Sequence, residues 1–176
     1  MEILREKCDI NIFDKEDDPI PRELLLEKIQ SAEGLLCLLT DKIDKEVFKK
    51  GKKLKVVSNC AVGYNNIDVN EATKRGIYVT NTPGILTETT ADLAFALMMA
   101  AGRRVVEGDK NIREKKWVHA WSLKMFIGSD IYGKTLGIIG LGRIGEAMVK
   151  RANGFDMKII YYTPTRREDL EKKYGI

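Results

Sequence analysis

The sequence predicts an α/β fold built on parallel sheets, on three observations. Short apolar runs bounded by charged or turn residues alternate with helical patterns along the chain, a rhythm typical of strand-helix-strand units. Pro83 and Gly84 predict a turn just before a long apolar helix, and the expected domain boundary lies there. A glycine-rich turn follows directly on one of the later strands.

The expected strands are short and rich in Val, Ile, Leu or Tyr, and each is expected to be buried on both faces. They are residues 10–13, 35–39, 55–58, 78–80, 135–139 and 158–162.

Between the strands lie three expected helices. The first, at residues 21–30, begins with a proline, and a shorter one at 44–50 has Asp44 at its N-cap position. The third, at residues 87–106, is apolar nearly all round and is therefore expected to be buried on more than one side. The following stretch, 106–132, reads as a connecting arm that packs on a neighbour.

Composition excludes several classes of protein. Lys and Arg total 30 and are interleaved with 26 Asp and Glu, which argues against a nucleic-acid-binding stripe. No apolar stretch approaches the roughly 20 residues that cross a membrane, and the charged start is unlike a signal peptide, so a cytoplasmic location is expected. The three cysteines have no metal-ligand spacing and are interpreted as reduced, mostly buried thiols, with no metal site.

The most informative motif is the GxGxxG turn formed by Gly140, Gly142 and Gly145. A buried strand precedes it and an amphipathic helix follows it, which is the context that a dinucleotide fingerprint requires. Gly140 is expected to make the tight turn, Gly142 to admit a pyrophosphate, and Gly145 to let the helix press on the sheet. A glycine-rich turn without a ligand is the alternative, and this context favours a bound cofactor.

The second strand of this unit should end near the adenosine ribose, where NAD-binding proteins usually place an acidic residue. Thr163 stands there instead, followed by Pro164, Thr165, Arg166 and Arg167. Guanidinium groups can bind a 2′-phosphate through bidentate hydrogen bonds, so NADP(H) is the favoured coenzyme and NAD(H) is the alternative. Alternatively, the two arginines only cap the next helix.

Three segments together resemble the D-2-hydroxyacid dehydrogenase family, in its order and spacing. They are residues 61–68 (AVGYNNID), 76–84 (GIYVTNTPG) and 140–145 (GLGRIG). Residues 20–39 and 161–163 are similar to the glyoxylate/hydroxypyruvate reductase branch in particular.

The resemblance implies two doubly wound parallel-sheet domains, one flavodoxin-like and one Rossmann, both incomplete here. Residues 1–83 would form part of the substrate domain, and residues 84–176 part of the NAD(P)-binding domain, with a dimerisation helix and arm at 87–132. Relatives open with a further strand before Glu2, so the substrate domain is expected to lack a central strand.

The resemblance also assigns site residues. The N–H groups of Val62 and Gly63 would hold the substrate carboxylate, where a flexible glycine beside a ligand is physically sensible. A strand-ending turn that serves only shape is the alternative. The residues implied for cofactor binding are Leu86 and Thr90 at the nicotinamide, Leu141, Gly142, Arg143 and Ile144 at the pyrophosphate, and Thr163, Pro164, Thr165 and Arg166 at the adenosine phosphate. Pro164 departs from relatives that place an arginine there.

No catalytic residue is assigned. The family uses an arginine to grip the keto acid, a histidine to donate a proton and a glutamate to orient that histidine, all well downstream of the glycine turn in relatives. This chain stops at Ile176, so the expectation is a truncated or partial enzyme. His119, the only histidine, precedes the glycine turn and is interpreted as structural.

The leading hypothesis is therefore that the chain is part of an NAD(P)H-dependent 2-hydroxyacid oxidoreductase that reduces glyoxylate or hydroxypyruvate by hydride transfer. The truncated chain itself is expected to be inactive. Its expected partners are a small 2-keto or 2-hydroxy acid and a second copy in a homodimer, with neither nucleic acid nor membrane. The alternative is a non-catalytic dinucleotide-binding or dimerising regulatory module. A cofactor-free flavodoxin-like interaction domain is a third hypothesis, and the context of the glycine turn argues against it.

Overall fold

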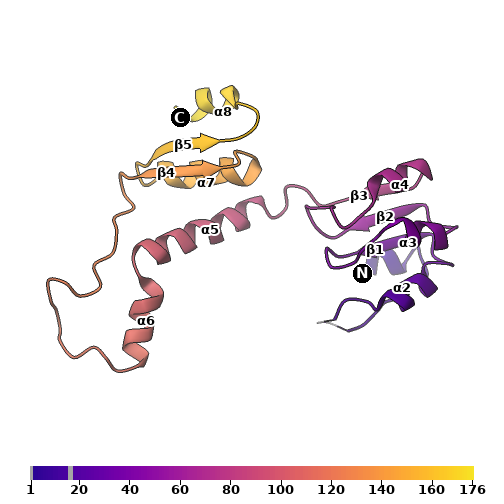
Figure 1. The fold of residues 1–176 in the computed structure, drawn as a ribbon, viewed down its shortest axis with the longest axis horizontal. Helices are drawn as coiled ribbons and strands as arrows, with labels where there is room; N and C mark the ends of the chain where they lie inside the picture. The colour runs from indigo at the N-terminus through magenta and orange to yellow at the C-terminus, as the bar shows by residue number, and fades with distance from the viewer. Residues whose placement is uncertain (1, 16–17) are drawn as a thin grey trace. The chain divides into compact units, whose positions relative to one another are not determined.

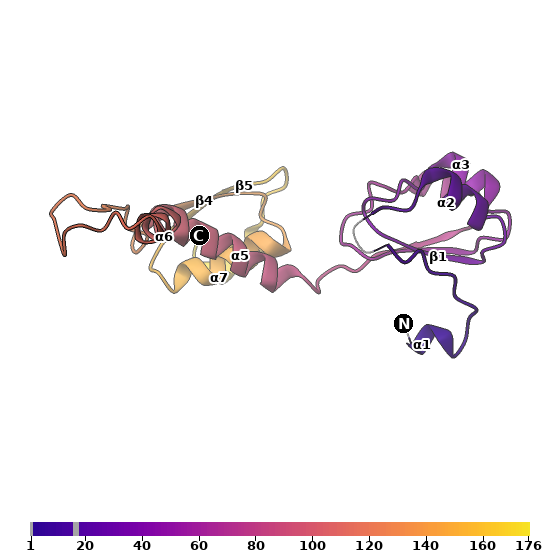
Figure 2. The ribbon, with the colours of Figure 1, turned by 90° about the horizontal axis from the view of Figure 1, so that it is seen from below.

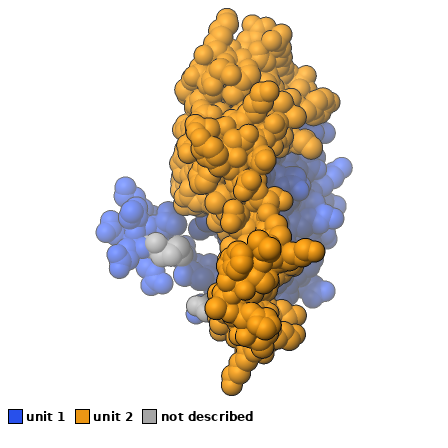
Figure 3. Space-filling model, turned by 90° about the vertical axis from the view of Figure 1, so that its left-hand side faces the viewer, with its two compact units in different colours: residues 1–83 blue, residues 84–176 orange. Residues whose placement is uncertain are grey.

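The computed structural model describes residues 2–15 and 18–176 (Figure 1). The chain forms two compact units, residues 1–83 and 84–176, and the boundary falls between Pro83 and Gly84 in the sequence (Figure 3). Each unit is an α/β unit with a parallel sheet, so the predicted fold class is confirmed. Among the described residues, no helix has both the length and the apolar content to cross a bilayer.

The first unit contains a sheet of three parallel strands in the order β1-β2-β3. Leu35 pairs with Val57, which pairs in turn with Val79. The elements in chain order are α1 (Glu2–Arg5), α2 (Arg22–Lys28), β1 (Gly34–Cys37), α3 (Lys45–Lys50), β2 (Val56–Asn59), α4 (Val69–Lys74) and β3 (Tyr78–Thr80).

Capping side chains start two of these helices. Asp44 accepts hydrogen bonds from the backbone N–H groups of Glu46 and Val47, as predicted for an N-cap. Asp68 caps α4 in the same way by accepting from Glu71. Arg22 on α2 pairs with the Asp44 carboxylate at 2.6 Å, so one acidic side chain both caps α3 and ties it to α2.

The core of this unit lies on one face of the sheet. Because the strand order runs in one direction, successive crossover helices fall on the same side, and α2 and α3 lie together on one side of β1 (Figure 2). Phe48 of α3 and Ile29, the C-cap residue of α2, pack on Val57 of the central strand, and all three are at most 1% exposed. The opposite face is open: Leu36 is 56% and Tyr78 76% exposed.

The second unit contains two parallel strands in register from the pair Thr135 and Lys158 to the pair Ile139 and Tyr162. Its elements are α5 (Thr87–Gly102), α6 (Val105–Arg113), β4 (Thr135–Ile139), α7 (Arg143–Asn153), β5 (Lys158–Tyr162) and α8 (Glu168–Tyr174). Both α5 and α7 lie on one side of β4 and β5 (Figure 2). Ile138, Val149 and Leu170 form the core between the strands, α7 and α8.

The prediction that every strand is buried on both faces is wrong. In each strand of the second unit, alternate residues are exposed, including Ile139 (90%), Ile160 (62%) and Tyr162 (69%). The physical reason is the same as in the first unit: the helices of the described chain cover one face only. An apolar composition shows only that a strand is able to be buried on both faces. Whether both faces are covered depends on where the helices pack.

The predicted strand at residues 10–13 is also absent. These residues form no regular element, and β1, at the edge of its sheet, pairs with β2 alone within the described ranges. Ile12 is 46% exposed, so this short run buries too little apolar surface to be held as a strand.

The helix predicted over residues 87–106 is two helices. It ends at Gly102, whose carbonyl accepts a hydrogen bond from Ser129 at 2.8 Å, and α6 begins after Arg104 in a left-handed conformation (φ 55°). The helix α6 occupies the first part of the predicted arm. The expected burial of α5 is wrong for this single chain, because Ala91 is its one fully buried residue and Leu93 and Leu97 are about 60% exposed.

The cysteines are less buried than predicted. Cys37 lies in the core at 2% exposure, but Cys8 and Cys60 are exposed, and all three are free thiols.

Candidate functional site

The glycine turn begins where β4 ends. Gly140 adopts φ of 95°, a conformation that side chains other than glycine rarely adopt, and its N–H donates to the carbonyl oxygen of Tyr162 at 2.8 Å. The chain therefore leaves the sheet in a single step while it is still hydrogen-bonded to β5. Such a sharp exit brings the start of α7 directly over the carboxyl end of β4.

The other two glycines of the turn have opposite surroundings. A Cβ atom on Gly145 would lie 2.5 Å from the carbonyl oxygen of Gly140 and 3.3 Å from Cγ2 of Ile138, so only a glycine lets α7 approach the strand this closely. A Cβ atom on Gly142 would meet nothing within 4 Å. The turn is thus tightly packed at Gly145 and open at Gly142, which is where a pyrophosphate would need to come close to the backbone.

The start of α7 offers backbone N–H groups to this open space. Gly142 is its N-cap, and no side chain caps the helix end. The first N–H groups of a helix have no partner within the helix and carry its positive dipole end, which suits a phosphate. Glu146 in the first turn accepts from Lys173 at 2.8 Å, a contact that lowers the pKa of Glu146 and offsets its charge.

The predicted pyrophosphate contacts differ in exposure. Leu141 is 1% exposed and its side chain belongs to the core, so only its backbone can face a ligand. Ile144 is 43% exposed, and Arg143 is exposed at the first position of α7. The glycine turn is therefore lined chiefly by backbone atoms and by the side chains of α7.

A shallow, open hollow lies at the carboxyl end of β5. Its lining residues are Tyr161, Tyr162, Thr163, Pro164, Arg166 and Glu171. The hollow contains three of the residues predicted to contact the adenosine phosphate, in one place and next to the glycine turn, since Tyr162 also accepts from Gly140.

The two arginines after β5 have different surroundings. Arg167 donates to the backbone oxygen of Leu141 at 3.0 Å and pairs with Asp169 at 2.9 Å, so it ties the glycine turn to the start of α8. Arg166 is 72% exposed at the hollow and pairs with Glu171 at 2.7 Å. Both arginines therefore pair with a carboxylate of α8, as in the alternative that they serve the next helix, and Arg166 also lines the hollow.

Glu171 was missed by sequence reasoning. It lines the hollow from α8, five residues after Arg166, and also accepts a hydrogen bond from the Tyr161 hydroxyl at 2.5 Å. The sequence did contain a signal for this contact. Glu171 lies about one helical turn into the helix that follows Arg166 and Arg167, and an acidic side chain at that position can reach back to an arginine.

Leu86 and Thr90, predicted at the nicotinamide, lie at the start of α5. Leu86 is the N-cap residue, 54% exposed, and its carbonyl accepts from the N–H of Thr90 at 3.0 Å. Both belong to the same unit as the glycine turn.

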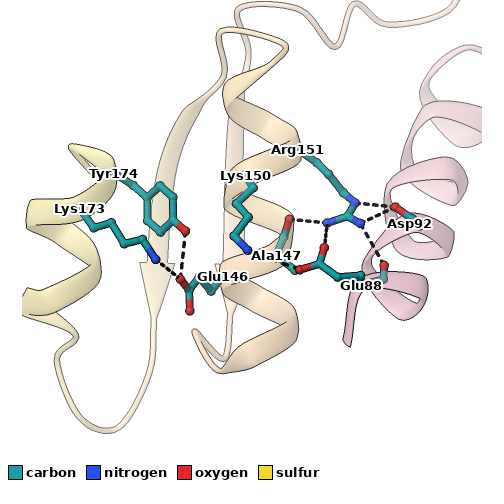
Figure 4. Close-up of polar contacts among 8 residues, drawn as sticks. All are labelled: Glu88, Asp92, Glu146, Ala147, Lys150, Arg151, Lys173 and Tyr174. Atoms are coloured by element: carbon teal, nitrogen blue, oxygen red, sulfur yellow. Dashed lines mark hydrogen bonds and ion pairs between the residues drawn. The ribbon is translucent and has the colours of Figure 1, made fainter. Parts of the chain in front are cut away.

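Arg151 fixes this end of α5 against α7. Its guanidinium donates to the carboxylates of Glu88 (2.9 Å) and Asp92, to the Glu88 backbone oxygen (3.0 Å) and to the Ala147 backbone oxygen (2.8 Å) (Figure 4). The hydrogen bonds to Asp92 and Glu88 raise the pKa of Arg151, and the guanidinium lowers the pKa of Glu88. Thr90 lies between the two acidic residues that are held in this way.

The predicted substrate-carboxylate turn lies in the first unit, just after β2. Val62 is 43% exposed, and the N–H groups of Val62 and Gly63 donate no hydrogen bond within the described chain. Gly63 has no positive φ, and a Cβ atom there would make ordinary contacts of 3.5 and 3.6 Å. The turn therefore does not require the flexibility of a glycine, contrary to the argument from sequence.

Asparagines shape this turn instead, and sequence reasoning missed them. Asn59, 1% exposed, donates to the backbone oxygen of Gly63 at 2.7 Å and to Asn66 at 3.1 Å. Asn81 donates to the backbone oxygen of Val62 at 2.8 Å. Since these contacts hold the two carbonyl groups, the adjacent N–H groups are left for an acceptor such as a carboxylate.

His119 lies in the irregular segment between α6 and β4. It is exposed, and no hydrogen bond or ion pair joins it to a carboxylate among the residues that the structure describes. The structural interpretation of His119 stays a prediction.

Comparison with known proteins shows where this geometry recurs. A family model described as D-isomer specific 2-hydroxyacid dehydrogenase, catalytic domain, matches residues 1–173. Glyoxylate reductase from Korarchaeum cryptofilum is 58% identical over 173 residues, an alignment that covers 98% of this chain and 52% of that protein. The chain thus spans about half the length of the curated relatives that it matches.

Two solved structures show the same fold with different coenzymes. An acyclic imino acid reductase in complex with NADPH and D-Arg matches with a TM-score of 0.81 and 29% identity, over 94% of this chain and 52% of that one. A D-lactate dehydrogenase from Aquifex aeolicus, complexed with NAD and lactic acid, matches with a TM-score of 0.76 and 28% identity, over 84% of this chain and 44% of that one.

Proposed function

Because the chain belongs to the D-isomer specific 2-hydroxyacid dehydrogenase family, we propose that it supplies the coenzyme and substrate-carboxylate contacts of an NAD(P)H-dependent oxidoreductase that reduces glyoxylate or hydroxypyruvate. The observation that carries the proposal is the glycine turn, which is closely packed at Gly145 and open at Gly142. Glyoxylate reductases among the similar proteins support the choice of substrate.

The residues fit a dinucleotide. Gly140, Gly142 and Gly145 with the start of α7 would hold the pyrophosphate, and Leu86 and Thr90 the nicotinamide. When bound, the reduced nicotinamide supplies a hydride for C2 of the keto acid. The chain's own residues bind and orient the two reactants.

NADP(H) is the proposed coenzyme, with NAD(H) as the alternative. Thr163, Pro164, Thr165 and Arg166 follow β5 at the place where an acidic residue would repel a 2′-phosphate. Arg166 is exposed at the hollow and can donate to phosphate oxygens.

The keto acid would bind through its carboxylate to the N–H groups of Val62 and Gly63. The asparagine contacts to the adjacent carbonyl groups support this role, because they fix the turn without using those donors. Successive backbone N–H groups in a turn can form a small anion-binding concavity.

We expect the 176-residue chain to bind NADPH without turnover. Its one histidine, His119, is exposed and has no carboxylate partner in the described part of the chain, so His119 is not held as an oriented proton donor. The same observation favours the second candidate function, a non-catalytic dinucleotide-binding or dimerising regulatory module.

A homodimer is the proposed assembly. In the second unit, α5, α6 and the segment after them expose many large apolar side chains, which is unusual for a monomer. They are Leu93, Leu97, Val105, Val106, Ile112, Trp117, Val118, Trp121 and Leu123. A cytoplasmic location stays a prediction.

The proposed function is tested by titrating the purified chain with NADPH and NADH, followed by coenzyme fluorescence. The same sample is assayed for NADPH oxidation with glyoxylate. Binding without oxidation supports the proposal for this chain. Absence of binding to either coenzyme contradicts it, and oxidation contradicts the expected lack of turnover and directs attention to His119.

A further inference from the structure

The hollow at the end of β5 contains a carboxylate that no dinucleotide contact requires. Glu171 lines it together with Arg166, Thr163 and Pro164. Both oxygens of Glu171 accept from Nε of Arg166, at 3.0 and 3.2 Å, and Oε2 also accepts from Nη2 at 2.7 Å. One edge of the guanidinium is thereby occupied by a partner within the chain.

This carboxylate stays ionised near neutral pH. The hydrogen bonds from Arg166 and from the Tyr161 hydroxyl lower the pKa of Glu171 to about 2. The hollow thus places a permanent negative charge beside the positive charge that would attract a phosphate.

Glu171 is held in place by its helix. Leu170, the preceding residue, is 3% exposed in the core. One turn of α8 further on, Lys173 and Tyr174 both donate to Glu146 of α7, at 2.8 and 2.9 Å (Figure 4). The Glu171 side chain is 20% exposed, whereas that of Arg166 is 72% exposed, so Arg166 is the partner that is freer to move.

From this arrangement we infer that Glu171 is a specificity-determining residue, which competes with the 2′-phosphate of NADP(H) for Arg166 and narrows the preference for NADP(H) over NAD(H). The inference rests on the proposed function, because it concerns the same coenzyme site. NAD(H) carries a hydroxyl in place of the 2′-phosphate, so it does not need Arg166 and gains nothing from its release.

The negative charge of Glu171 should weaken NADPH binding. A 2′-phosphate within reach of Arg166 also comes within a few ångströms of the Glu171 carboxylate, and like charges at that distance repel. Arg166 is 72% exposed, although Glu171 is 20% exposed, so solvent and salt reach the pair from the Arg166 side and the repulsion is modest and screened by salt. Removing the charge of Glu171 should therefore favour NADPH selectively, and more so at low ionic strength.

The test is Glu171→Gln, which keeps the size of the side chain and an oxygen that can accept from Tyr161. Dissociation constants for NADPH and NADH are measured by fluorescence titration at low and high salt. The NADPH constant is expected to fall about fivefold at low salt, in the range of an exposed charge pair. The NADH constant is expected to change less than about twofold.

Glu168→Gln is the control for the loss of charge without the loss of a hydrogen bond. It removes the same charge from the same helix, and Glu168 receives no hydrogen bond from Arg166 in the described chain, although its charge contributes to the raised pKa of Arg166. It should change both constants by less than about twofold. In an Arg166→Gln background, the Glu171→Gln change should lose its effect on NADPH, as a double-mutant cycle requires for a coupled pair.

Each outcome decides the matter. Selective tightening of NADPH that disappears without Arg166 supports the inference. Weaker NADPH binding by Glu171→Gln overturns it and shows that Glu171 presents Arg166 to the phosphate. Equal changes for both coenzymes also overturn it. If the unmodified chain binds neither coenzyme, the proposed function fails first, and the inference fails with it.

Discussion

Arg151 and Glu88 are joined twice, by side chain and by backbone. The Arg151 guanidinium pairs with the Glu88 carboxylate at 2.9 Å and also donates to the Glu88 backbone oxygen at 3.0 Å (Figure 4). The backbone contact fixes the first turn of α5 itself, not only a side chain. This turn lies next to Leu86 and Thr90, so the contact connects α7, which follows the glycine turn, with the proposed nicotinamide end of α5.

Replacing Arg151 with Met should loosen α5 from α7. Five donated hydrogen bonds are lost, and we expect the thermal midpoint of the second unit to fall by a few degrees and NADPH to bind more weakly. Arg113→Met is the control, since Arg113 is 77% exposed and, among the residues that the structure describes, pairs with Asp109 alone, on its own helix. An equal effect of both substitutions on thermal denaturation would refute this special role of Arg151.

Gly142→Ala and Gly145→Ala should separate binding from folding. A methyl group at Gly145 meets the Gly140 carbonyl at 2.5 Å, and such overpacking should cost about 1–3 kcal/mol of stability in urea denaturation. A methyl group at Gly142 meets open space, so stability should be unchanged while NADPH affinity falls about tenfold or more, through loss of close phosphate contacts. Normal NADPH binding by Gly142→Ala would show that the glycine turn is not part of the coenzyme site.

Asn59→Leu should destabilise the first unit. Asn59 is buried, and the substitution removes the donors to Gly63 and Asn66 without changing the side-chain size much. Leaving buried acceptors without partners costs about 1–3 kcal/mol. Asn81→Leu removes one exposed contact to Val62 and should cost less than about 0.5 kcal/mol. The two variants are compared by urea denaturation followed by circular dichroism, and equal costs would count against a special role for Asn59.

Cys37 should not react with thiol reagents in the folded protein. Burial, aided by the nearby charge of Asp41, raises the pKa of Cys37 to about 11, whereas Cys8 and Cys60 are exposed. A thiol-reactive chromophore at pH 8 should therefore modify two cysteines in buffer and three in denaturant. Rapid modification of all three in buffer would show that the core around Cys37 opens readily.

The raised pKa of Cys37 also predicts how the stability of the fold changes with pH. The thiol pKa is about 9 when unperturbed and about 11 in the folded chain, so the unfolded state loses its proton first as the pH rises. The contribution of Cys37 is fully present below pH 9 and is lost as the pH rises towards 11. Urea denaturation at pH 8 and pH 10.5 measures this loss, which Cys37→Ala should reduce.

The parts of the fold that depend on local physics were predictable from the sequence. The five strands of the two sheets, the Asp44 cap and the glycine turn follow from apolar runs, a short acidic side chain before a helix, and glycines placed where a strand meets a helix. Each of these signals lies within a few residues of the feature that it predicts.

The parts that depend on distant contacts were not predictable. Whether residues 10–13 form a strand depends on a neighbouring strand, and the exposed faces at Ile139 and Tyr78 depend on which helices cover the sheet. In the candidate site, the partner of Arg166 is set by the path of α8, and the Val62 turn is shaped by Asn59 and Asn81. No local pattern carries that information.

Amide NMR of the uniformly 15N-labelled chain, titrated with NADPH, tests the central claim most directly. If the glycine turn and the end of β5 form the coenzyme site, the largest shifts should fall on residues 140–146 and 163–166, and Gly142→Ala should move the midpoint of these shifts to an NADPH concentration about tenfold higher. Shifts confined to other residues, or none at saturating NADPH, would contradict the account.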